Sequence, residues 1–284
     1  MVDDVHDETD VLRVAAVTVG YDRTPVIADV AFCVRRGDCM GLLGVNGAGK
    51  STLLRAITGQ LPLRSGQVWI SGVDLGRYPE RAKRGFGYAV DGASLPMTLT
   101  GAEYLELVAS IRGCHPRDWP FGDMIEPLGL RKWLGEPIGA CSLGTQMKLS
   151  IAAALLDTPP LIILDESLNG LDPVAAWQVK RMVAAIMRTG RHGVVLATHV
   201  LETITSVCNC AMFIEAGRVA HRWDSRDLAL AVQRPDGFEG HPFQGVAARA
   251  LASTRAVETW ARATAPSTYP LGLVTLGPRL LVAI

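Results

Sequence analysis

The stretch that decides the fold is GVNGAGKS, residues Gly44–Ser51. It fits the pattern G-x-x-x-x-G-K-[ST], and it lies between a short apolar run at 38–44 and a helical pattern at 51–59. Glycines allow backbone N–H groups to turn toward an anion, and a helix N-terminus adds partial positive charge. The stretch therefore predicts a phosphate-binding loop, in which Lys50 reaches the β- and γ-phosphates of a nucleotide and Ser51 places its hydroxyl on Mg²⁺.

A second group of polar residues follows two apolar runs further along the chain. LIIL (161–164) precedes Asp165 and Glu166, and VVLAT (194–198) precedes His199. The carboxyl ends of parallel strands are where ligands bind in open α/β sheets. We therefore predict that Asp165 holds Mg²⁺, that Glu166 takes a proton from an attacking water, and that His199 contacts the γ-phosphate.

The same apolar runs predict a parallel sheet. Strands buried on both faces are expected to be continuous apolar runs, and two such runs are LIILDE and GVVLATH. Residues 173–189 between them have helical periodicity. Strand, helix and strand in this order form a βαβ crossover, which joins parallel neighbours. Roughly alternating, β-branched residues at 11–20 and 26–34 predict two further strands upstream of the phosphate loop.

Two segments have the pattern of a helix N-terminus. Thr100 and Glu103 have the spacing of a capping box at the start of a helical pattern. CSLGTQMKLS (Cys141–Ser150) places Ser142 just ahead of a second helical stretch. Ser142 offers a hydroxyl and Gly144 lets its backbone N–H approach an anion closely, so one turn can both cap a helix and contact a phosphate.

The composition limits the classes of protein that fit. The chain has 284 residues with 28 basic and 28 acidic side chains, so no net positive charge recruits nucleic acid or an anionic membrane. No apolar run reaches the roughly 18 residues that span a bilayer, and the acidic start lacks the basic region of a signal peptide. Six scattered cysteines favour separate thiols over a metal site. We expect a cytoplasmic location and no nucleic-acid partner.

Together these residues resemble the nucleotide-binding subunits of ABC transporters, over roughly residues 11–235. GVNGAGKST resembles the Walker A motif of that family, LIILDES its Walker B strand, SLNGLD its D-loop, and His199 its switch histidine. The resemblance implies an export-type subunit that binds ATP and Mg²⁺ and hydrolyses ATP, with Glu166, His199 and Lys50 as catalytic residues. It also implies that the ring of Tyr21 stacks on adenine. The remaining implied ATP contacts are Gly44, Val45, Asn46, Gly47, Ala48, Gly49, Lys50, Ser51, Thr52, Ser142 and Gly144.

Two positions depart from the family pattern. CSLGT stands where the family has LSGGQ, a loop that contacts ATP bound to the other subunit of a head-to-tail dimer; Leu143 replaces its first glycine and Thr145 its glutamine. Asp91 stands where the family has a glutamine that senses Mg²⁺. A carboxylate oxygen also suits that metal, so the expected Mg²⁺ ligands are Ser51, Asp165 and Asp91.

The resemblance also implies the architecture and the partners. We expect an α/β fold with a P-loop NTPase core and a mostly parallel sheet, an antiparallel β subdomain at the N-terminus, and an inserted helical subdomain at about 92–157. The ATPase domain would span 11–235, and the sequence assigns no role to the tail at 236–284. The expected partners are a second ATPase subunit, in a homodimer or heterodimer, and a transmembrane permease subunit on a separate chain. That permease would dock on residues 92–115, at the cytoplasmic face of the cell membrane.

Three alternatives stay open. A soluble ABC-type ATPase of translation or DNA repair usually carries two ATPase modules or a coiled-coil insertion, and neither is visible in this sequence. A degenerate regulatory subunit is favoured by Leu143 and Asp91 and opposed by Glu166 and His199. A GTPase or small-molecule kinase would also use a phosphate loop, but the sequence has no N-K-x-D guanine motif. The transported substrate is not predicted.

Overall fold

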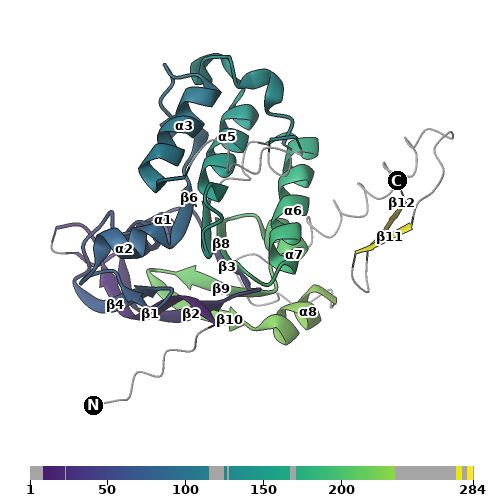
Figure 1. The fold of residues 1–284 in the computed structure, drawn as a ribbon. Coiled ribbons are helices and arrows are strands. Elements are labelled where there is room, and N and C mark those ends of the chain that lie inside the picture. Colours follow the sequence, from purple (N-terminus) through teal and green to yellow (C-terminus); the bar gives the residue numbers. More distant parts are fainter. Residues whose placement is uncertain are drawn as a thin grey trace. The chain divides into compact units, whose positions relative to one another are not determined.

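Two β-sheets organise the structure, a computed structural model that describes residues 9–22, 24–114, 125–126, 128–166, 171–233, 273–276 and 280–283. The chain divides into two units, Met1–Arg234 and Pro235–Ile284. Among the described residues, the first unit contains a six-stranded sheet of order β10-β9-β3-β8-β7-β6 and a four-stranded sheet of order β2-β1-β4-β5 (Figure 1).

The six-stranded sheet is mostly parallel. Its neighbours pair in parallel from β9 through β3, β8 and β7 to β6, whereas β10 pairs antiparallel with β9. The strands are β3 Cys39–Leu43, β6 Phe86–Ala89, β7 Leu161–Asp165, β8 Gly193–Thr198, β9 Cys210–Glu215 and β10 Arg218–Trp223. Helix α6, Pro173–Arg188, joins β7 to β8, and both strands are buried along almost their whole length. The predicted parallel sheet with its βαβ crossover is confirmed.

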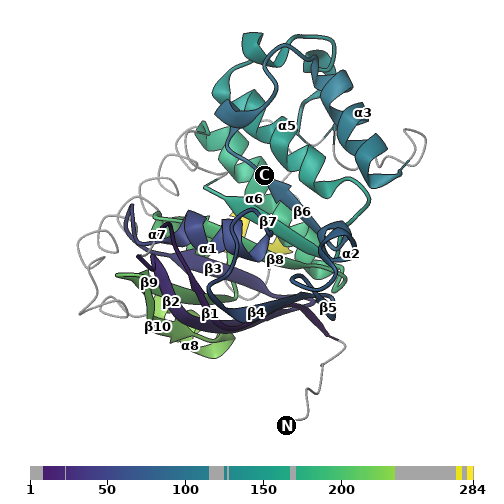
Figure 2. The ribbon, with the colours of Figure 1, turned by 90° about the vertical axis from the view of Figure 1, so that its left-hand side faces the viewer.

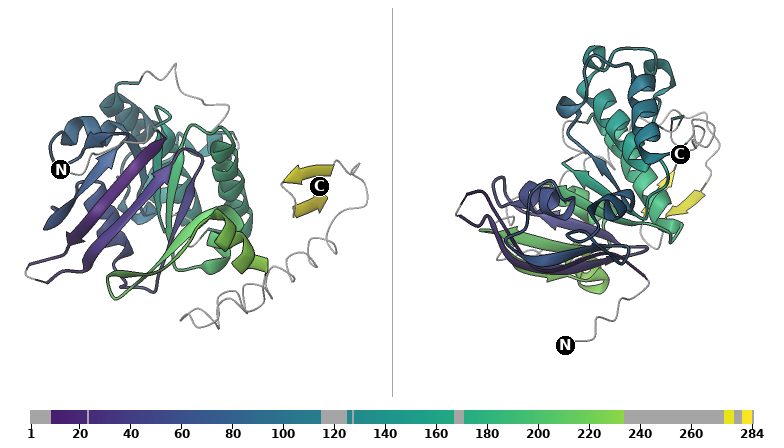
Figure 3. Two further views of the ribbon diagram at one scale, coloured as in Figure 1. Left: turned by 90° about the horizontal axis from the view of Figure 1, so that it is seen from below. Right: turned by 60° about the vertical axis from the view of Figure 1, so that its left-hand side comes forward.

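The four-stranded sheet is antiparallel and comes from the N-terminal part of the chain. It consists of β1 Asp10–Val19, β2 Ile27–Arg35, β4 Ser65–Ile70 and β5 Val73–Asp74. Figure 3 shows its purple strands from below, beside the light green hairpin of β9 and β10. Buried and accessible residues alternate along much of β2, as expected of a sheet with one face against the core. The predicted antiparallel β region is therefore confirmed.

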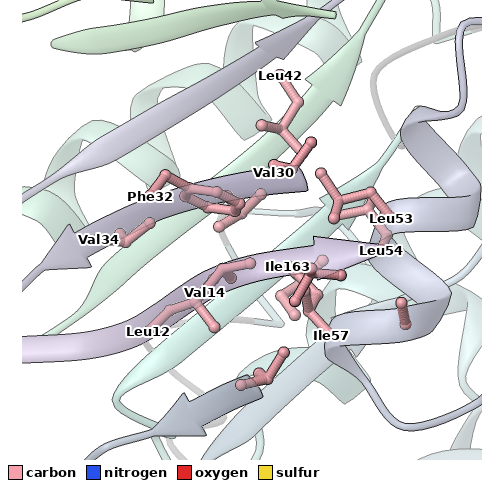
Figure 4. Close-up of a cluster of buried hydrophobic side chains, with 14 of the residues drawn as sticks. Leu12, Val14, Val30, Phe32, Val34, Leu42, Leu53, Leu54, Ile57 and Ile163 are labelled. Atoms are coloured by element: carbon pink, nitrogen blue, oxygen red, sulfur yellow. The ribbon is translucent and has the colours of Figure 1, made fainter. Parts of the chain in front are cut away.

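Helix α1, Lys50–Ile57, joins the two sheets through one hydrophobic core. Figure 4 shows that this core combines α1 with strands of both sheets through Leu12, Val14, Val30, Phe32, Val34, Leu42, Leu53, Leu54, Ile57 and Ile163. Burial of this apolar surface is the main stabilising term of such a core. Because α1 is fixed on two sides, the phosphate loop at its N-terminus is fixed as well.

Two helices, α3 Gly101–Arg112 and α5 Leu143–Leu155, lie side by side beyond the end of β6 (Figures 1 and 2). The predicted capping box of α3 is present, since Thr100 Oγ1 accepts from Glu103 N at 3.2 Å and Glu103 Oε2 accepts from Thr100 N at 2.8 Å. α5 packs closely on β6, because a Cβ added to Gly87 would lie 1.7 Å from the carbonyl oxygen of Ala154. This contact fixes the helix that carries the Ser142 turn.

Shorter elements complete the first unit, and a hairpin belongs to the second. The helices are α2 Pro79–Arg84, α7 Leu201–Val207 and α8 Ser225–Gln233, and the 3₁₀ turns are η1 Gly92–Ser94, η3 Arg131–Trp133 and η4 Ile138–Ala140. In the second unit, β11 Leu273–Leu276 pairs antiparallel with β12 Leu280–Ala283. The rest of the tail predicted at 236–284 lies outside the described residues. Within the described ranges, none of the helices combines the length and the apolar character that a bilayer crossing requires.

Candidate nucleotide-binding site

The loop at Gly44–Gly49 has a backbone that requires glycine. Gly47 has φ +82° and Gly49 has φ +103°, a region that side-chain-bearing residues rarely adopt. Gly49 is the N-cap of α1, and a Cβ on it would lie 2.6 Å from Ile27 Cδ1. A Cβ on Gly44 would lie 2.7 Å from the carbonyl oxygen of Ile214. The loop therefore follows the surface of the core without room for side chains at Gly44 and Gly49.

A cavity of about 180 Å³ opens beside this loop. It is lined by Val26, Asn46, Gly47, Gly49, Lys50, Ser51, Thr52 and Glu166. α1 has no side-chain cap, and the first N–H groups of an α-helix have no intrahelical acceptors, so its N-terminus is suited to an anion. Of the other predicted loop residues, Ala48 is buried and Val45 is half exposed.

Lys50 supplies a positive charge at the base of the loop. Its side chain is 3% exposed, and Nζ donates to the carbonyl oxygens of Gly44 at 2.9 Å and Val45 at 3.2 Å. The same nitrogen lies 3.6 Å from Glu166 Oε1. A buried ammonium is costly unless it is paired, and these three oxygens supply the pairing while leaving the charge beside the cavity.

Asp165 ends β7 and is held through both of its carboxylate oxygens. Ser51 Oγ donates to Oδ1 at 3.3 Å, and the hydroxyl of Tyr88 donates to Oδ2 at 3.2 Å. Burial raises the pKa of Asp165, and the two hydrogen bonds oppose that rise. Burial, reinforced by the charge of Asp165, also raises the pKa of Tyr88, so its hydroxyl stays a donor. The Ser51 and Asp165 oxygens are the donor atoms that Mg²⁺ prefers.

Glu166 lies between the Lys50 ammonium and the His199 imidazole. Its Oε1 faces Lys50, and its Oε2 is 3.4 Å from His199 Nδ1, on the residue that follows β8. Its backbone has φ +50° and its N–H donates to the carbonyl of Ala197 at 2.9 Å. About a third of the carboxylate side chain is exposed, beside the cavity that it helps to line. A carboxylate in this position has access to water and to a group bound in the loop.

Tyr21 stands on the loop between β1 and β2. Its ring is half exposed, and its hydroxyl accepts from Arg55 Nη1 at 3.2 Å, which lowers the pKa of Tyr21. Arg64 Nη2 donates to the carbonyls of Tyr21 at 3.2 Å and Thr24 at 3.3 Å, and also to that of Asp22. The ring therefore presents a surface to solvent while the loop that carries it is held in place.

Asp91 lies two residues beyond β6, the strand next to β7. It is the N-cap of η1, and its Oδ1 accepts from Ala93 N at 3.2 Å. The described hydrogen bond of its side chain is therefore made within its own turn. The other two predicted Mg²⁺ ligands, Ser51 and Asp165, are hydrogen-bonded to each other. The structure places Asp91 just beyond the carboxyl end of β6, and its described hydrogen bond does not join it to that pair.

The turn at Ser142–Gly144 is both a helix start and part of the surface. Ser142 Oγ caps α5 by accepting from Thr145 N at 3.3 Å. Ser142 and Leu143 are exposed and Gly144 is partly exposed, so the turn faces outward rather than into the core. Part of the expected D-loop, Ser167–Gly170, lies outside the described residues. The sequence did not predict the hydrogen bonds of Tyr88, Arg55 and Arg64.

Comparisons with known proteins agree with this geometry. Residues 27–169 match the family model described as ABC transporter. A solved ATP-binding subunit of an ABC transporter is 31% identical, with a TM-score of 0.73 over 85% of this chain and 99% of that one. A dimeric ATP-binding cassette in a post-hydrolysis state, bound to ADP and Pi, shares the fold at 21% identity, with a TM-score of 0.67 over 76% of this chain and 99% of that one.

The curated relatives are much longer proteins. The human retinal-specific phospholipid-transporting ATPase ABCA4 is 35% identical over 210 residues, which is 71% of this chain and 9% of that protein. The human phospholipid-transporting ATPase ABCA7 is 33% identical over 213 residues, which is 74% of this chain and 10% of that protein. The chain thus spans about a tenth of the length of these relatives.

Proposed function

The chain belongs to the ABC transporter family as an ATP-binding ATPase domain, and from this premise we propose that it drives export through a permease subunit on a separate chain. The observation that supports ATP hydrolysis in this proposal is a set of contacts around one loop, Ser51–Asp165 and Lys50–Glu166–His199. In this proposal ATP is the substrate, its phosphates lie in the loop, and Tyr21 stacks on the adenine.

The proposed chemistry is hydrolysis of the γ-phosphate. Glu166 accepts a proton from the attacking water, because its carboxylate lines the cavity and stays partly accessible to solvent. Lys50 and His199 donate to the γ-phosphate oxygens, where negative charge gathers in the transition state. Both side chains already face Glu166, so a bound phosphate would compete with that carboxylate for them.

The residues present also fit Mg²⁺. Ser51 Oγ and Asp165 Oδ1 are hard oxygen donors 3.3 Å apart, and a nearby cation would stabilise the partly buried carboxylate. Within the described part of the chain, no group of three or more His, Cys, Asp or Glu side chains forms a metal site by itself, so nucleotide oxygens and water would complete the set. Bound Mg²⁺ would neutralise charge on the β- and γ-phosphate oxygens. Asp91 would join this set through the oxygen that does not cap η1.

A second ATPase subunit, identical or related, is the proposed partner at the nucleotide. Ser142 and Gly144 present a hydroxyl and an accessible backbone on the surface at the N-terminus of α5, where partial positive charge favours an anion. The solved post-hydrolysis cassette of the same fold is a dimer bound to ADP and Pi. ATP held between the loop of one copy and the turn of the other would stabilise the closed dimer by linkage.

The membrane partner is proposed to dock beside α3. Leu107 is 48% exposed and Ile111 is 77% exposed, one helical turn apart on α3 and inside the predicted contact segment 92–115. Apolar residues exposed in this way suit a protein partner.

The direction of transport is proposed to be export. Two observations favour it: the amino-acid sequence of the segment at 141–145, and relatives named as phospholipid-transporting ATPases. The chain would then work at the cytoplasmic face of the membrane, with no nucleic-acid partner because its charge is balanced.

The decisive experiment replaces Glu166 with Gln. Glu166→Gln keeps the size and polarity of the side chain but removes the base, so we expect ATP binding to persist and turnover to fall by about 10²–10⁴-fold. Light scattering after gel filtration should show an ATP-dependent dimer that accumulates in the variant. Glu106→Gln, on an exposed position of α3, is the matched control and should behave as wild type. A Glu166→Gln protein that neither dimerises on ATP nor loses turnover would refute the proposal.

A second candidate function is a degenerate regulatory subunit that binds nucleotide beside an active partner. The exposed side chain of Leu143 at the Ser142 turn favours it, because the family's small glycine is missing where a phosphate would approach. Steady-state ATPase activity of the chain, measured alone and with its partner chains, distinguishes the two functions. Activity of the chain alone that is lost with Glu166→Gln supports the active subunit.

A further inference from the structure

We propose that Tyr88 is a positioning residue, whose hydroxyl orients the Asp165 carboxylate so that the oxygen next to Ser51 is presented to Mg²⁺. The inference rests on the proposed function, since it concerns the same metal–nucleotide site. Tyr88 is the third residue of β6, and β6 pairs in parallel with β7, with Tyr88 opposite Ile163. Its ring therefore extends along the strand direction to reach Asp165, two residues further along β7.

The two oxygens of Asp165 are held from two different elements. Ser51 Oγ, from α1, lies 3.3 Å from Oδ1, and the Tyr88 hydroxyl, from β6, lies 3.2 Å from Oδ2. The terminal torsion of an aspartate is broad and roughly two-fold, so one hydrogen bond leaves the carboxylate plane weakly defined. Two donors on opposite oxygens define that plane. Metal ligands are commonly oriented in this way by hydrogen bonds from groups that do not touch the metal.

Packing alone does not account for the hydroxyl. The ring of Tyr88 packs against the hydrophobic core cluster, a role that phenylalanine would fill equally well. The hydroxyl instead meets a partly buried carboxylate, and a hydrogen bond to a charged group contributes more than one between neutral groups. Removing that hydroxyl while keeping the ring separates orientation of Asp165 from filling of the core.

The test is Tyr88→Phe in the full chain, with Tyr104→Phe as the matched control. Tyr104 lies on α3, is partly buried, and loses the same single oxygen atom. The Mg²⁺ concentration that half-saturates ATP binding is measured by calorimetry with ATP fixed, and ATP affinity is measured again in EDTA. For Tyr88→Phe we expect the Mg²⁺ requirement to rise about tenfold, with affinity in EDTA unchanged. Tyr104→Phe should match wild type in both measurements.

A double mutant keeps the inference falsifiable if Tyr88→Phe also lowers stability. If Tyr88 acts through Asp165, Tyr88→Phe should not raise the Mg²⁺ requirement further in an Asp165→Asn background. An unchanged Mg²⁺ requirement in Tyr88→Phe, or an equal loss of ATP affinity with and without Mg²⁺, overturns the inference and leaves the proposed function standing. Wild-type protein that binds no ATP overturns the proposed function and the inference together.

Discussion

Gly49→Ala is the substitution that tests most directly how the phosphate loop is held. Gly49 has φ +103°, so any other residue there carries backbone strain of about 1–3 kcal/mol. The added Cβ would also lie 2.6 Å from Cδ1 and 3.2 Å from Cγ1 of Ile27. Ile27 is fully buried in the core cluster, so it can move only by displacing its neighbours, and overpacking of this kind costs about 1–3 kcal/mol.

These two effects predict a loss of about 4 kcal/mol in the free energy of unfolding. The melting temperature should fall by about 10 °C, since a domain of roughly this size loses about 2–4 °C per kcal/mol. Gly47→Ala is the matched control, because Gly47 also has positive φ, at +82°, but an added Cβ there meets no atom within 4 Å. That control should lose about 1–2 kcal/mol from strain alone. Thermal melts without nucleotide measure both; if Gly49→Ala is no less stable than Gly47→Ala, the loop does not pack on Ile27 as described.

Three further predictions follow from contacts at the site. Burial raises the pKa of Asp165 in the folded chain, so the charged carboxylate destabilises the fold at pH values above that pKa. Asp165→Asn removes this charge and should therefore raise the nucleotide-free melting temperature at about pH 8. That gain should shrink toward about pH 4 as the wild-type carboxylate becomes protonated, and a gain that grows on acidification would contradict the sign. Arg64→Ala should weaken ATP binding about fivefold by releasing the loop of Tyr21, with tripolyphosphate binding unchanged in the same calorimetric assay. Leu143→Gly should cost about 1 kcal/mol of stability or less and raise dimer turnover, because the half-exposed side chain no longer separates the turn from the phosphate; lower turnover would contradict this.

Local sequence patterns were enough to place most of the expected site. Lys50 and Ser51 follow the loop after β3, Asp165 ends β7 and Glu166 comes next, and His199 follows β8. These strands lie in the order β3-β8-β7, so the carboxyl ends of three neighbours meet at one edge of the sheet. A single βαβ unit and the phosphate loop therefore suffice to predict which side chains come together.

The contacts that escaped prediction depend on pairing between distant segments. Tyr88 reaches Asp165 only because β6 pairs with β7 in the register that sets Tyr88 opposite Ile163. The backbone N–H of Arg64, just before β4, donates to the carbonyl oxygen of Thr18 near the end of β1. This pairing brings Arg64 beside the loop that carries Tyr21. Periodicity and capping patterns report on neighbours within a few residues, whereas register is decided by packing across the sheet. The capping contact of Asp91 is different, because it joins Asp91 to Ala93 only two residues further on, and it therefore does not depend on register.

The distribution of polar groups within one chain favours the two-copy proposal. The described lining of the nucleotide cavity comes from residues 26–52 together with Glu166, and the turn at Ser142–Gly144 is not among it. That turn is nevertheless exposed, begins a helix, and has its hydroxyl and backbone at the surface. A helix N-terminus at the surface and a cavity that this turn does not line are complementary features if a second copy brings them together. One chain would then bind ATP in its loop, and turnover would require the second chain, so the specific ATPase rate should rise with protein concentration.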